Sequence, residues 1–227
     1  MLLAIDTATR LMSLALHDGH QLLAEQTWYT ANNHTAELAP AVVDLLARCE
    51  VAVTDLTAMG VSVGPGSFTG LRIGVALAKG MAAAQHLPLV GVSTLDTLAA
   101  GQPPYLRHAL ITVVEAGRGR IIAATYRWGK NQWVSRGEAQ LMTWQTLLET
   151  VDGPAYITGD VDDKGYAAVQ HAQTDAEVPV RIAPPAWRLR RAGFLAEIAY
   201  ERLNELGNDA FDPALAAPLY VKTRDIP

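Results

Sequence analysis

The spacing of apolar and polar positions predicts a chain of short strands separated by turns and helices. The apolar segments 2–6 and 12–17 are typical of strands. Asp18-Gly19 predicts a hairpin to a third strand over 21–28, because glycine adopts the positive φ of a tight turn. Two further buried strands are expected at 59–63 and 87–92.

Two segments of this first half show the spacing of amphipathic helices. One helix is expected to begin after Asn32 or Asn33, with its apolar face formed by Leu38, Val42, Leu45, Leu46 and Cys49. A second helix is expected from about 71 to 84, directly after a glycine-rich segment. A third is expected to begin at Ser93 or Thr94, whose hydroxyls can cap a helix.

The second half repeats this order after Gly101-Gln102-Pro103-Pro104, which predicts a boundary between two lobes. Strands are expected at 109–114, 120–127, 132–139 and 155–158, and helices near 143–150, 164–172 and 187–206. The repeated order predicts a duplicated α/β fold in which each lobe has a mixed sheet with flanking helices. The expected lobes are 1–102 and 103–227.

Composition narrows the classes of function. The formal charge of -5 argues against a chain that grips nucleic acid by itself, because that requires clustered cations. The single cysteine, Cys49, excludes an internal disulfide and a cysteine-only zinc site. The longest apolar stretch, 73–84, contains Lys79 and falls short of the roughly 20 residues that span a membrane. Without a visible targeting segment, the chain is expected to be cytoplasmic and free of the membrane.

The segment from Gly64 to Gly74 is the strongest local feature, and it allows two interpretations. A glycine loop that leads into a helix presents backbone N–H groups to an anion, with Arg72 as the nearby cation. It lacks the Gly-Lys-Ser/Thr of a phosphate-binding Walker A loop. In the favoured interpretation, small residues at every fourth position from Gly70 let the helix pack closely against a neighbour.

Other residues with catalytic chemistry are sparse. Asp6 ends the first strand and could direct a metal or a phosphate, but a structural role in its turn is favoured. His34 is interpreted as a polar residue at a helix start, since no second histidine stands at metal-binding spacing. Ser67 lacks nucleophile spacing and an evident histidine partner. Arg188, Arg190 and Arg191 form either a solvated face or a small anion patch.

Several of these motifs together resemble the TsaB (YeaZ) family, whose members help to make threonylcarbamoyladenosine on tRNA. The most specific is Gly-Pro-Gly-Ser-Phe-Thr-Gly-Leu-Arg-Ile-Gly at 64–74, followed by Gly-Val-Ser-Thr-Leu at 91–95. Leu-Ala-Ile-Asp-Thr-Ala-Thr at 3–9, His34-Thr35 and Pro-Leu-Tyr-Val at 218–221 also fit. One departure is Glu115-Ala116-Gly117-Arg118, where the family usually has Asp-Ala-Arg.

The resemblance implies an actin-like, sugar-kinase-like fold and a non-catalytic role. The related catalytic subunit, TsaD, carries a His-x-x-x-His metal motif where this chain has Ser93-Thr94-Leu95-Asp96-Thr97. Implied partners are a second copy, TsaD and, in a larger complex, the ATPase TsaE, with any tRNA contact indirect or weak. No tightly bound cofactor or metal is implied, and ATP or ADP is expected only at an interface with a partner.

Partner binding is expected on the two helices at 35–49 and 70–84. Such an interface would bury on the order of 1,600 Å² around a few apolar anchors. The expected interface residues are Leu38, Val42, Leu45, Leu46, Cys49, Leu71, Gly74, Val75, Ala78 and Ala82. The alternative is a stand-alone phosphotransferase or peptidase-like enzyme that contacts an anion or nucleotide through Asp6, Gly66, Ser67 and Arg72.

Overall fold

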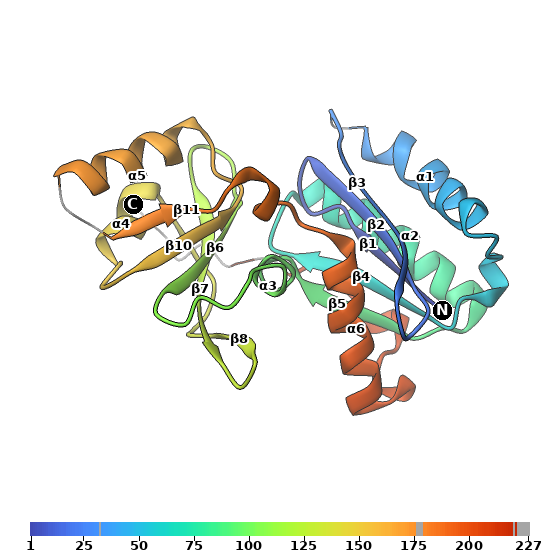
Figure 1. The fold of residues 1–227 in the computed structure, drawn as a ribbon. Helices are drawn as coiled ribbons and strands as arrows, with labels where there is room; N and C mark the ends of the chain where they lie inside the picture. The colour runs from blue at the N-terminus through green and yellow to red at the C-terminus, as the bar shows by residue number, and fades with distance from the viewer. Residues whose placement is uncertain (32, 176–178, 220, 222–227) are drawn as a thin grey trace. The chain divides into compact units, whose positions relative to one another are not determined.

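The computed structural model describes residues 1–31, 33–175, 179–219 and 221, and it divides into two compact units (Figure 1). The first unit combines Met1–Thr97 with Arg190–Leu219, and the second lies within Leu98–Leu189. Each unit contains one mixed β-sheet with helices packed against it, so the predicted fold class is confirmed. Within the described residues, no helix combines the length and apolarity needed to cross a bilayer.

The first sheet has the strand order β3-β2-β1-β4-β5. Strand β1 pairs antiparallel with β2 on one side and parallel with β4 on the other. Every residue of β1 is buried, as expected for a central strand covered on both faces. The five strands are β1 (Leu2–Asp6), β2 (Leu11–His17), β3 (Leu22–Tyr29), β4 (Ala58–Gly64) and β5 (Leu89–Ser93).

Helices cover the two faces of this sheet through separate clusters of apolar side chains. Helices α1 (His34–Arg48) and α2 (Phe68–Gln85) pack on the face that includes Leu3 and Ile5 (Figure 1). Helix α6 (Ala192–Leu206) packs on the opposite face, which includes Leu2 and Ala4. Because side chains alternate along β1, this strand contributes residues to the apolar clusters on both faces of the sheet.

The second sheet has the order β11-β10-β6-β7-β8, with β9 paired to β7. Read from β8, this order repeats the topology of the first sheet, which agrees with the predicted duplication. Helices α4 and α5 pack on one face around Ile111, Ile157 and Val169. Helix α3 (Thr94–Ala100) begins in the first unit and ends in the second. The elements of the second unit are β6 (Ala109–Glu115), β7 (Ile121–Gly129), β8 (Gln132–Ser135), β9 (Gln140–Met142), α4 (Trp144–Glu149), β10 (Ala155–Gly159), α5 (Asp163–Asp175) and β11 (Val180–Ile182).

The division of the chain differs from the expected lobes 1–102 and 103–227. Residues 190–219 belong to the first unit because α6 buries its apolar face on the first sheet. The closing helix also begins at Ala192 rather than near 187. Its start is set by buried contacts, since the Ala192 N–H donates to the Ser13 hydroxyl. A short 3₁₀ turn at Pro185–Trp187 precedes it.

Candidate functional site

Asp6 lies at the carboxyl end of β1, where it is fully buried and paired with Arg190. Arg190 Nε is 3.4 Å from Asp6 Oδ2, and neither side chain is exposed. Arg190 also donates to the Thr9 hydroxyl and to the Leu11 carbonyl, the latter at 3.2 Å. Asp6 Oδ1 accepts the Ala8 N–H at 2.8 Å. The carboxylate is thus neutralised and hydrogen-bonded within the chain, in agreement with the favoured structural interpretation.

The glycine-rich segment is bonded to the turn that follows β1. Ser67 caps α2 by accepting the Gly70 N–H at 3.2 Å, and the Ser67 N–H donates to the Ala8 carbonyl at 2.6 Å. The Thr7 hydroxyl donates to the Gly70 carbonyl at 2.7 Å. These bonds fix the start of α2 against the end of β1.

The glycines of this segment are required by close backbone approach. A Cβ atom on Gly66 would collide with the Ala8 carbonyl, one on Gly70 with the Thr7 carbonyl, and one on Gly74 with the Thr7 hydroxyl. Only glycine allows contact this close without displacing a neighbour. The packing interpretation of the glycine spacing is therefore confirmed.

Of the four residues considered for anion or nucleotide contact, Gly66 and Ser67 lie against the 7–8 turn and Asp6 is held by Arg190. Arg72 is exposed, and its guanidinium lies over the Phe68 ring, 3.7 Å from the centroid. His34 is buried, with Nε2 2.8 Å from the Thr9 carbonyl. Among the described residues, no group of three His, Cys, Asp or Glu side chains is arranged to hold a metal ion.

Sequence reasoning missed the role of Arg190. It treated Arg188, Arg190 and Arg191 as one group, although only Arg191 pairs at the surface, where Nε donates to Glu25 at 2.7 Å. A signal was present, because the charge of a carboxylate at the end of a buried strand has to be neutralised. The sequence did not show which arginine would do so.

The side chains expected to bind a partner lie in the protein's own core. Leu38, Val42, Leu45 and Leu46 of α1 are at most 4% exposed, and Cys49 is partly buried. On α2 the buried residues are Leu71, Gly74, Val75, Ala78 and Ala82. Most of these side chains pack against the first sheet, and Val42 and Leu46 also line a hollow between α1 and α2.

The outward faces of α1 and α2 carry small and apolar residues beside the exposed charges of Asp44, Arg48 and Arg72. The small and apolar residues of α1 are Ala36, Ala39, Pro40, Val43 and Ala47, and those of α2 are Ala76, Gly80, Ala83 and Ala84. Val43 is 65% exposed. The charge of Lys79 is turned toward the chain itself, because Nζ donates to the carbonyls of Ala214 and Ala216, both at 3.0 Å.

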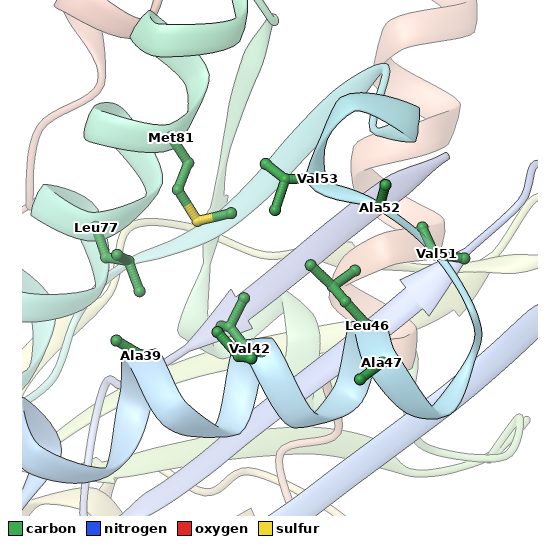
Figure 2. A pocket seen from close by; sticks show the side chains of 10 residues that line it. Ala39, Val42, Leu46, Ala47, Val51, Ala52, Val53, Leu77 and Met81 are labelled. Carbon is green, nitrogen blue, oxygen red and sulfur yellow. The ribbon is translucent and has the colours of Figure 1, made fainter.

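A hollow of about 390 Å³ lies between these two helices. Figure 2 shows Leu77 and Met81 of α2 pointing into it from one side, and Val42 and Leu46 of α1 from another. Val53, in a 3₁₀ turn at Val53–Asp55, closes the end. The lining side chains, all apolar, are Ala39, Val42, Val43, Leu46, Ala47, Val51, Ala52, Val53, Leu77 and Met81. Such a surface favours an apolar side chain over water.

The duplicated topology defines the class of protein. The structure resembles the ROK-family hexokinase of Thermus thermophilus with a TM-score of 0.51 and 14% identity, over 89% of this chain and 99% of that one. YeaZ from Pseudomonas aeruginosa is more similar, with a TM-score of 0.77 and 24% identity over 97% and 99% of the two chains. The fold is thus the actin-like, sugar-kinase-like fold.

Sequence relatives give the family. Residues 26–174 match the family model described as TsaD, tRNA N6-adenosine threonylcarbamoyltransferase. The tRNA threonylcarbamoyladenosine biosynthesis protein TsaB of Bacillus subtilis is 37% identical over 164 residues, which are 70% of each chain. The chain belongs to the TsaB/YeaZ family.

Proposed function

We propose that this protein takes part in threonylcarbamoyladenosine formation on tRNA, as a non-catalytic subunit that binds and activates TsaD. The name of the Bacillus subtilis relative supports the pathway. The Asp6–Arg190 pair supports the non-catalytic role, because a carboxylate neutralised by a buried arginine is not available to direct a phosphate or a metal. The proposed place of action is the cytoplasm.

The observation that carries the proposal is the apolar hollow between α1 and α2. The lining of the hollow has the features of an interface core, because all of its residues are apolar. Small residues such as Ala76 and Gly80 allow another helix to approach closely, since interaxial distance depends on the side chains at the contact. The proposed occupants are large apolar side chains from a partner helix.

Such an anchor makes a substantial contribution to the free energy of binding. Burying one leucine- or phenylalanine-sized side chain contributes about 1.5–3 kcal/mol, and the hollow has room for more than one. The same surface is proposed to pair two copies of this chain in a homodimer. TsaE is proposed to join the larger complex, with ATP or ADP held only where subunits meet.

The direct test is Val43→Arg, which places a charge at the rim of the hollow without touching the core. TsaD binding, measured by calorimetry, is expected to weaken by at least about 100-fold, because an unpaired charge in an interface core costs several kcal/mol. Val134→Arg, at an exposed position of β8, is the matched control and leaves binding unchanged. If Val43→Arg binds normally, the assigned surface is wrong.

The function itself is tested by threonylcarbamoyl transfer to tRNA with purified TsaD and TsaE. Transfer is expected to depend on this protein and to be reduced by Val43→Arg in proportion to the lost binding. A protein that has no effect on transfer, and that alone turns over a nucleotide or a peptide, would instead be a stand-alone enzyme.

A further inference from the structure

The second unit carries a cluster of aromatic rings at one end of its sheet. Tyr105 and Tyr156 stack with their centroids 4.2 Å apart, and His108 lies 5.2 Å from Tyr156. Trp128 and Trp133 meet edge to face at 5.5 Å, and Tyr105 links the two groups, 5.9 Å from Trp133. The proposed partner binding on α1 and α2 leaves this cluster without a role.

These rings lie on the sheet face opposite helices α4 and α5. Ala155 and Ile157 point toward those helices, so Tyr156 between them points away. Trp128 and Trp133 are register partners across β7 and β8 and share one face. All five rings are partly exposed, and their edges are therefore accessible from solvent.

Part of the cluster is fixed by hydrogen bonds. Trp133 Nε1 donates to the Gln102 carbonyl at 3.2 Å, and the Tyr105 hydroxyl donates to Gln102 Oε1 at 3.5 Å. Burial, and secondarily the neighbouring Tyr156, raises the pKa of Tyr105, which keeps its hydroxyl neutral. The hydrogen bonds hold Tyr105 and Trp133 in place, so the cluster needs little ordering before it binds a flat ligand.

Three exposed cations surround this aromatic cluster. Arg181 of β11 is the register partner of Tyr156, so its side chain leaves the sheet beside that ring. Arg107 precedes His108, and Lys130 is in the tight turn between β7 and β8 (Figure 1). The one acidic side chain placed near them by an ion pair is Asp152, which is 4.0 Å from Arg127 in the part of the chain that the structure describes.

Acidic residues lie at both ends of this sheet: Glu149 and Asp152 precede β10, and a second group lies at the other end. Glu115 ends β6, Asp160 follows β10, and the Glu115 N–H donates to Asp160 Oδ2 at 3.2 Å. Asp162 and Asp163 come next, at the start of α5. The exposed cations Arg118 and Lys164 lie at that end as well, which allows a direct comparison with Arg107, Lys130 and Arg181.

We propose that this aromatic and basic end of the second sheet binds single-stranded RNA. Unpaired bases stack on the solvent-exposed ring surfaces, and phosphates pair with Arg107, Lys130 and Arg181. The inference goes beyond the proposed function, which assigns no RNA contact to this chain. Contact through three cations is weak by itself, with a dissociation constant of about 10⁻⁴–10⁻⁶ M, and gains strength inside a complex.

The test measures fluorescence anisotropy of a labelled single-stranded RNA, and of the same RNA in a full duplex, with the full chain alone. The single strand is expected to bind more tightly, with quenching of tryptophan fluorescence. Arg107→Gln with Arg181→Gln is expected to weaken binding about tenfold and to lower the salt slope by about 1.4, since each phosphate contact on a single strand contributes about 0.7.

The matched control is Arg118→Gln with Lys164→Gln, two exposed cations at the other end of the same sheet. It is expected to bind RNA like the parent. Absence of RNA binding by the parent, equal loss in both double variants, or preference for the duplex would each overturn the proposal. So would normal RNA binding together with lost TsaD binding in the Arg107/Arg181 variant, which would assign the cluster to a protein partner. TsaD binding through α1 and α2 is measured separately, so either proposal can fail alone.

Discussion

Replacing Arg190 with methionine removes the charge that neutralises Asp6 while retaining much of the side-chain volume. Both groups are completely buried, and the guanidinium also donates to Thr9 and Leu11. The variant therefore removes the arginine charge that faces a buried carboxylate, together with one donor to Thr9 and one to Leu11. Its effect on stability therefore measures how strongly the segment that leads into α6 is held against the first sheet.

The complete burial of the ion pair determines the expected loss of stability. Removing one partner of a buried ion pair costs about 3–5 kcal/mol, because the remaining charge stays desolvated. For a chain of this length each kcal/mol lowers the melting temperature by about 2–4 °C, so a fall of about 6–20 °C is expected. Arg191→Met is the matched control. Arg191 is 47% exposed where it pairs with Glu25, and such pairs contribute about 1 kcal/mol or less.

The assay is thermal unfolding followed by circular dichroism, on Arg190→Met, Asp6→Asn and the double variant. The double variant is expected to be more stable than Arg190→Met alone, because it buries no unpaired charge. Such a coupling is the signature of a direct interaction. If Arg190→Met unfolds within about 3 °C of the parent, or if the two substitutions are additive, the buried pair does not have the assigned role.

Three further predictions concern α2 and α1. Gly74→Ala places a methyl group against the Thr7 hydroxyl and is expected to cost about 1–3 kcal/mol in thermal unfolding, whereas Gly80→Ala, with open space around it, is stabilising or neutral. Ser67→Ala removes the cap of α2 and should cost about 1 kcal/mol in the same assay; no change would mean that the cap is dispensable. The hydrogen bond from Trp28 lowers the pKa of Glu37 below its ordinary 4.5, so its contribution to stability is present above that pH and is lost as pH falls through the lower folded value. Glu37→Gln should flatten the unfolding profile below about pH 4.5, and an unchanged profile would contradict this assignment.

The order of elements could be predicted from the sequence because alternating and helical apolar spacings differ clearly along this chain. The division into units could not, since the apolar stripe of α6 does not show which sheet it covers. The start of α6 was misplaced for a related reason. Arg190 has the local features of a surface residue, and its burial depends on Asp6, more than 180 residues earlier.

The candidate partner surface is a second feature that the sequence alone did not predict. Helical periodicity identified the side chains of α1 and α2 with the largest apolar content, and these are the ones that the protein uses for its own core. The surface available to a partner combines alanine, glycine and the exposed Val43 and Val53 with the apolar lining of the hollow, and amphipathic spacing treats most of these positions as the polar side. A helix that packs on a sheet and also binds a partner needs two apolar faces. Helical periodicity in the sequence shows only the face with the larger side chains.

The return of α6 to the first sheet has a consequence for synthesis of the chain. Roughly 100 residues separate β5 from α6, which corresponds to about 5–20 s of translation at ordinary rates. During that interval one face of the first sheet, including Leu2, Ala4 and Val90, has no helix to cover it, while the second unit emerges whole. The second unit can therefore fold before the first, although the first begins the chain. A fragment that ends after β5 would expose the same apolar face permanently.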